Sequence, residues 1–132
     1  MLPTAQAEGK EREKEMKTGL ILEGGAMRGM FSAGVMDVMM ENGIRFDGII
    51  GVSAGAAFGV NYKSGQIGRA IRYNAKYCRD KRYCGVGSLL KTGNLFNTEF
   101  CYGEVPLKLD AFDFDTYEKD PTAFYVTCTD IE

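Results

Sequence analysis

Short apolar runs alternate with longer amphipathic stretches over the first half of the chain. The apolar runs at 18–22 (TGLIL) and 44–50 predict two buried strands, the second interrupted by Asp47-Gly48. The stretch 29–42 between them predicts a helix ended by Asn42-Gly43, since glycine takes the left-handed conformation readily. The face of this helix that is expected to be buried carries Phe31, Val35, Val38 and Met39.

A second helix-compatible run, 54–62, follows the second strand. The order strand, helix, strand, helix predicts two parallel strands joined by a right-handed crossover. The carboxyl ends of both strands then lie at the same edge of one sheet, which is where open α/β sheets bind their ligands.

The second half of the chain has a less regular pattern. The stretch 65–80 predicts a helix with a basic, solvated far end (Arg69, Arg72, Lys76, Arg79, Lys81, Arg82) and an approximate buried stripe of Ile67, Ala70, Ile71, Asn74 and Tyr77 or Cys78. Residues 86–99 are expected to be rich in loops, and 102–110, which contain Pro106, to be irregular. Asp115 is expected to cap a short turn, and 123–128 to return as a strand.

Composition narrows the class of protein. The 132 residues suffice for one modest domain, and 45% hydrophobic with 26% charged residues is ordinary for a globular protein. Residues 1–17 are densely charged and predict a disordered tail, so the domain is assigned to 18–132. A net charge of −2 provides no basic field for nucleic acid. No apolar run approaches the roughly 18–20 residues of a membrane span, and no signal-peptide core is evident, so a cytoplasmic location is expected.

Two residue counts restrict the chemistry. The chain contains no histidine, so a Ser-His-Asp triad cannot be assembled from it. Its four cysteines show no C-x-x-C spacing, which favours reduced thiols over a zinc site or a disulfide framework. A nucleophilic serine would therefore need a carboxylate, a lysine or a group from outside this chain as its base.

The first candidate motif is the G-x-S-x-G pentapeptide at 51–55. It stands between the second strand and the following helix, which is the context of a nucleophile elbow. Gly51 and Gly55 are expected to flank Ser53 because side chains there would collide with the neighbouring strand or helix. Ser53 would then have a strained backbone and lie at the positive end of the helix. Packing alone also favours small residues at such junctions, so the pentapeptide by itself does not establish a catalytic role.

The second motif is the glycine-rich turn at 23–29 (EGGAMRG), directly after the first strand. It lacks the Gly-Lys-Ser/Thr of a Walker A loop, and Ala26 makes it a poor dinucleotide fingerprint. It suits an oxyanion hole, in which bare backbone amides face a developing negative charge. A simple tight turn is the plainer alternative. The shared sheet edge predicts that this turn lies beside Ser53, and the pair is far more specific than either motif alone.

Together, EGGAMRG and GVSAG resemble the patatin-like phospholipase family, which has a three-layer α/β/α fold with a mostly parallel sheet. In the family's pattern, Gly24, Gly25 and Ala26 correspond to the oxyanion glycines, Arg28 to the basic position that braces the loop, Gly29 to the closing glycine and Ser53 to the nucleophile. Ala26 departs from the usual glycine, so its φ is expected to be negative. The resemblance spans 18–132 and implies an N-terminal part of the domain.

The resemblance implies a lipid acyl hydrolase that uses a serine–aspartate dyad. The aspartate of the family lies in a downstream D-G-G or D-G-A motif that this sequence lacks, since Asp47-Gly48 precedes the serine. The chain alone is therefore expected to be inactive, with a truncated sheet whose open edge favours self-association. A lipid or phospholipid ester is the implied substrate, with neither metal nor organic cofactor. Peripheral membrane contact through the basic, tyrosine-containing stretch at 69–83 is a weaker hypothesis.

Two alternatives stay open at this point. A thioesterase or transacylase of the same fold would use the same serine with a different substrate or acyl acceptor. A non-enzymatic module would use the glycine turn to bind an anion such as phosphate or a lipid head group.

Overall fold

The computed structural model describes residues 16–130, so most of the tail expected at 1–17 lies outside the described residues. Three strands, β1 (Gly19–Leu22), β2 (Gly48–Val52) and β3 (Ala123–Thr127), form one sheet in the order β1-β2-β3. Both neighbouring pairs are parallel. The expected parallel unit of two strands and a crossover helix is therefore confirmed.

The second strand begins four residues later than its apolar pattern indicated. Residues 44–47 form the connection into it, because Asp47 turns back to β1. Its carboxylate accepts hydrogen bonds from the Thr18 amide at 2.7 Å and the Thr18 hydroxyl at 3.2 Å. These bonds keep the Asp47 pKa below its ordinary value, with the bond from the Thr18 amide as the largest contribution.

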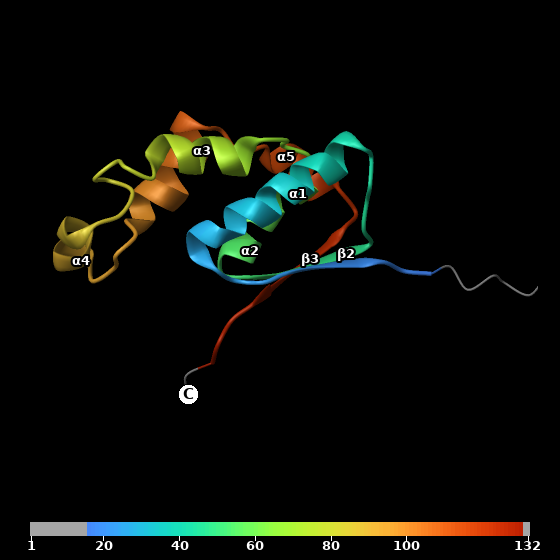
Figure 1. Ribbon diagram of the computed structural model, residues 1–132, viewed down its shortest axis with the longest axis horizontal. Helices are drawn as coiled ribbons and strands as arrows, with labels where there is room; N and C mark the ends of the chain where they lie inside the picture. The colour runs from blue at the N-terminus through green and yellow to red at the C-terminus, as the bar shows by residue number, and fades with distance from the viewer. Residues whose placement is uncertain (1–15, 131–132) are drawn as a thin grey trace, which may run out of the picture.

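Helices α1 (Gly29–Glu41), α2 (Ala54–Lys63), α3 (Arg69–Tyr77) and α5 (Phe114–Lys119) lie on one side of the sheet (Figure 1). The core between these layers contains Leu22, Ile49, Met36, Phe58 and Tyr62. The expected α/β class with a parallel sheet is confirmed, and the described residues supply the sheet and one helical layer. The other face of the sheet carries Ile21, Ile50 and Tyr125 in one row of the register, all exposed.

The buried face of α1 differs from the expected one. Phe31 is 81% exposed and Val38 57% exposed, whereas Ala33 and Met36 are buried. Small residues decide this orientation, because they let α1 approach α2 closely. A β-carbon at Gly29 would lie 2.9 Å from the Phe58 ring, so that side of α1 must face α2.

Helix α3 is shorter than the stretch 65–80, and Arg69 lies in the interior instead of on a solvated face. Arg69 is 4% exposed and its guanidinium donates to the Asn61 side chain at 2.7 Å. It also donates to the backbone carbonyls of Asp110 and Ala111. The fold tolerates the buried guanidinium because its polar groups have hydrogen-bond partners. Ile67, expected in the buried stripe, is 45% exposed.

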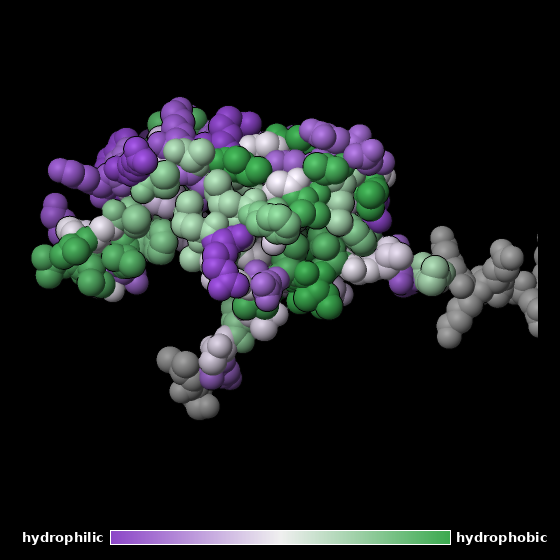
Figure 2. Space-filling model, in the orientation of Figure 1, coloured by the Kyte–Doolittle hydropathy of each residue, from purple (hydrophilic) through white to green (hydrophobic). Residues whose placement is uncertain are grey.

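The segment after α3 is more helical than expected. Helix α4 (Val86–Thr92) replaces part of the expected loop, and a π-helical segment, η2 (Phe100–Leu109), replaces the expected irregular stretch. Exposed apolar residues of α4 form the green projection at the left end of Figure 2. The cap of α5 is Asp113, not Asp115, since Asp113 accepts from the Thr116 amide at 2.9 Å. All four cysteines are free thiols.

Candidate active site

Ser53 stands at the junction of β2 and α2 with φ 50° and ψ −118°, a conformation that is strained for any residue with a side chain. The two flanking glycines are required by space. A β-carbon at Gly51 would lie 2.6 Å from the backbone nitrogen of Ala56, and one at Gly55 would lie 2.3 Å from the carbonyl oxygen of Leu22. The strand, sharp turn and helix around Ser53 therefore have the geometry expected of a nucleophile elbow.

The glycine turn leads from β1 into a short 3-10 helix, η1 (Ala26–Arg28), which continues into α1. The Arg28 amide donates to the Gly25 carbonyl at 3.0 Å, and the Arg28 side chain lies against Gly25. Ala26 has a φ of 46°, so the expectation of a negative φ is wrong. The tight turn imposes this conformation, and the alanine adopts it despite its methyl group.

The two motifs meet at the carboxyl edge of the sheet. A β-carbon at Gly24 would lie 3.1 Å from the β-carbon of Ser53, so a side chain there would crowd the serine. Within the described part of the chain, the amides of Gly25 and Ala26 donate to no backbone carbonyl. The Ala54 amide adds a further donor because the first amides of a helix have no partner within it. The motifs in the sequence do not single out this third donor, although it follows directly from the position of Ser53.

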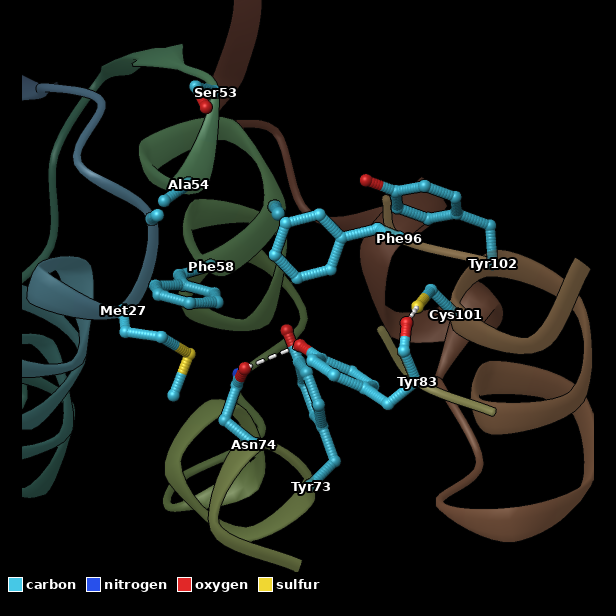
Figure 3. A pocket seen from close by; sticks show the side chains of 12 residues that line it. Met27, Ser53, Ala54, Phe58, Tyr73, Asn74, Tyr83, Phe96, Cys101 and Tyr102 are labelled. Carbon is cyan, nitrogen blue, oxygen red and sulfur yellow. Dashed lines mark hydrogen bonds between the residues drawn. The ribbon is translucent and has the colours of Figure 1, made fainter. Parts of the chain in front are cut away.

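A pocket of about 230 Å³ opens beside Ser53. Figure 3 shows Ser53 at one end and Asn74, Tyr73 and Tyr83 at the other, with apolar side chains between them. Met27 comes from the glycine turn, Phe58 from α2 and Phe96 from the loop after α4. No acidic side chain is among the described residues that line this pocket.

The far end of the pocket is polar but uncharged at neutral pH. The Tyr83 hydroxyl donates to the Asn74 side-chain oxygen at 2.6 Å, and the Asn74 amide group donates to the Ala70 carbonyl at 2.8 Å. Burial raises the pKa of Tyr73 to about 12, raises that of Tyr83 further, and raises that of Cys101 to about 11. The pocket therefore presents no charge to a ligand.

Sequence reasoning missed the pocket residues beyond α2. Tyr83 and Phe96 are brought together by an antiparallel bridge between Cys84 and Phe96, with the Asn97 amide donating to the Tyr83 carbonyl at 3.1 Å. Their rings meet edge to face with centroids 5.8 Å apart. A pairing this short leaves no alternating pattern in the sequence, so only the apolar character of Leu95-Phe96 hinted at it.

Comparison with known proteins agrees with this geometry. The family model described as patatin-like phospholipase matches residues 20–130. The chain belongs to the patatin-like phospholipase family. It is also 29% identical over 99 residues to the uncharacterized protein YjjU of Escherichia coli (strain K12), an alignment that covers 71% of this chain and 28% of that protein. No solved structure matches the chain.

Patatin-like phospholipases are typically serine hydrolases. The part of YjjU that this chain matches is only 28% of the length of that protein. Among the described residues, no helix is both long and apolar enough to cross a bilayer. The same residues contain no group of three or more acidic, cysteine or histidine side chains placed to hold a metal ion.

Proposed function

We propose that the protein containing these residues is a serine acyl hydrolase that cleaves lipid esters, with Ser53 as its nucleophile. The observation that carries the proposal is the contact of the two motifs, in which the backbone of Gly24 lies directly against Ser53. The strained φ of 50° at Ser53 supports it, because strain of this kind persists only where surrounding structure imposes it.

The reaction follows from the placement of these groups. The Ser53 oxygen attacks the ester carbonyl carbon while its proton passes to a general base, and the carbonyl oxygen becomes an oxyanion. The amides of Gly25, Ala26 and Ala54 stabilise that charge. Losing one such donor typically costs about 3–4 kcal/mol of transition-state stabilisation. The tetrahedral intermediate then collapses and expels the alcohol, which takes the proton from the base. Water finally hydrolyses the acyl-enzyme.

The substrate class follows from the character of the pocket. Its middle is apolar and its polar end carries no charge at neutral pH, so an acyl chain is favoured over a charged ligand. This combination supports a lipid or phospholipid ester as the substrate. A thioesterase or transacylase would use the same pocket, and parallel kinetics with matched thioester and oxygen-ester substrates distinguishes these activities.

The general base is proposed to be an aspartate that follows residue 132 in a longer reading frame. Two observations support this placement: no described pocket residue is acidic, and the matched relative is much longer than this chain. The 132-residue chain should then hydrolyse p-nitrophenyl butyrate no faster than its Ser53→Ala variant. Full activity in the short chain would refute the proposed base.

Labelling with a fluorophosphonate probe tests the nucleophile directly. The protein expressed from its complete reading frame should be labelled at Ser53, and Ser53→Ala should abolish the label. Ser32→Ala, a matched change on α1, should leave the label unchanged. Absence of labelling in the folded protein would instead favour a non-enzymatic module that binds anions at the glycine turn.

A further inference from the structure

The far end of the pocket beside Ser53 is closed by two tyrosines and an asparagine from separate elements. Tyr73 and Asn74 come from α3, and Tyr83 follows that helix in the chain. Asn74 is 1% exposed and Tyr83 is 8% exposed. Figure 3 shows this group across the pocket from Ser53, with Phe58 and Phe96 along the space between. We refer to Tyr73, Asn74 and Tyr83 as the pocket floor.

Hydrogen bonds fix the floor in position. The Tyr83 hydroxyl bonds to Asn74, and Asn74 in turn bonds to the Ala70 carbonyl one turn earlier on α3. The Tyr83 backbone carbonyl accepts from the Cys101 thiol at 3.5 Å and from the Asn97 amide at 3.1 Å. A ligand that pushed Tyr83 aside would leave Asn74 buried without its partner, which is unfavourable.

The volume of the pocket sets a length. An apolar cavity of about 150 Å³ holds one benzene molecule, so 230 Å³ corresponds to a chain of about eight or nine carbons. The volume also lies below the range of about 300–1,000 Å³ typical of sites for drug-sized ligands. A longer straight chain would have to break the floor or bend out through the open side of the pocket.

We propose that this pocket is an acyl-chain site of limited depth, in which the hydrogen-bonded floor of Tyr73, Asn74 and Tyr83 selects medium-length acyl groups. The inference rests on the proposed function, because it places the ester carbonyl at Ser53 and the end of the acyl chain at the floor. Tyr83 is the residue that determines chain-length specificity, since its ring closes the pocket and its hydroxyl holds Asn74.

Two substitutions should move the preferred chain length in opposite directions. Tyr83→Ala removes the ring that closes the pocket and should favour longer chains. Ala57→Leu adds bulk on α2 one helical turn after Ser53 and should favour shorter ones, because positions four apart share a helix face. Tyr83→Phe keeps the ring but removes the hydroxyl that bonds to Asn74, so it should lose part of the original preference. Ala75→Leu, on the exposed side of α3, is the matched control for Ala57→Leu.

The assay measures rate constants for labelling of Ser53 by butyl, octyl and hexadecyl fluorophosphonates, using the protein from its complete reading frame. The unmodified protein should react with the octyl probe roughly tenfold or more faster than with the hexadecyl probe, as expected if the long chain must break a buried hydrogen bond. Tyr83→Ala should remove most of this ratio, and Ala57→Leu should make butyl the preferred probe. Equal rates for all three probes would overturn the proposed floor and leave the proposed function intact.

A binding measurement separates the two proposals if no probe reacts. Calorimetric titration with octanoate and with palmitate needs no reactive serine. Tighter binding of octanoate, weakened by Ala57→Leu but not by Ala75→Leu, would support the acyl site even where the nucleophile had been disproved. Octanoate binding that Ala57→Leu leaves unchanged, or no binding at all, would overturn it. Ala57→Leu also provides a test if Tyr83→Ala fails to fold.

Discussion

The conformation of Ala26 makes a specific prediction about stability. Ala26 has a φ of 46° in the glycine turn, where an L-residue places its β-carbon too close to its own backbone. The side chain is exposed, so removing its methyl group sacrifices little apolar burial. Ala26→Gly should therefore relieve strain without opening a cavity.

The expected magnitude follows from two opposing terms. Removing an alanine from the left-handed conformation stabilises the folded protein by roughly 1–2 kcal/mol. The extra freedom of glycine in the unfolded chain costs about 0.5–1 kcal/mol. The net expectation is stabilisation of about 0.5–1 kcal/mol, from these two terms together.

Ala75→Gly is the matched control. Ala75 is exposed on α3 in ordinary helical conformation, so its replacement by glycine should destabilise the protein by about 1 kcal/mol. Because both variants change alanine to glycine, the unfolded-state term is common to them. Their difference in unfolding free energy therefore isolates the strain at Ala26.

Urea-induced unfolding measures this difference, provided that the slopes of the two transitions agree. Thermal unfolding gives a second readout, with a shift of about 4 °C for each kcal/mol in a chain of this size. If Ala26→Gly destabilised the protein as much as Ala75→Gly, the turn would not hold Ala26 in a strained conformation. The assignment of a strained, preorganised turn would then be wrong.

Three further changes test the packing around the site. Gly55→Ala should lower the free energy of unfolding, measured with urea, by about 3 kcal/mol, because its β-carbon would lie 2.3 Å from a carbonyl oxygen. Gly87→Ala has open space around the new methyl group and should not destabilise the protein. Arg69→Met should lower the free energy of unfolding by about 3 kcal/mol because it leaves buried acceptors unpaired. The exposed Arg72→Met should lower it by under about 1 kcal/mol. Equal losses in the two variants would contradict the structural role assigned to buried Arg69. The hydrogen bond from Arg72 is the main reason that the pKa of Asp110 lies below its ordinary value of 3.8. Ionised Asp110 should therefore stabilise the fold fully above this pH, and the stabilisation should be lost as the pH falls further. In the Asp110→Asn variant, the free energy of unfolding should vary less with pH over this range.

Local patterns were sufficient for the elements that form the site. The strand before Ser53, the glycines on either side and the helix that follows are all determined by residues within a few positions of one another. The parallel arrangement followed from the order of elements, because a crossover through a helix returns the chain to the same edge of the sheet. The contact between Gly24 and Ser53 is the observed form of that prediction.

Other features depended on contacts between distant residues. Helix α1 has apolar residues on more than one side, and only the close approach at Gly29 selects which side is buried. Arg69 looked like part of a solvated basic run, yet acceptors 8 to 42 residues away surround its guanidinium. The pocket floor joins Asn74 to Tyr83 through a hydrogen bond whose existence depends on the turn between them.

The amino-acid sequence by itself determined that an exposed serine follows a strand and that a donor-rich turn follows the strand beside it. Glycine spacing and apolar runs fix such features, since they act through backbone sterics over a few residues. The tertiary structure alone decided the burial of Arg69 and the depth of the pocket. Each of these is set by how much space the rest of the chain leaves, a quantity that no short stretch of sequence contains.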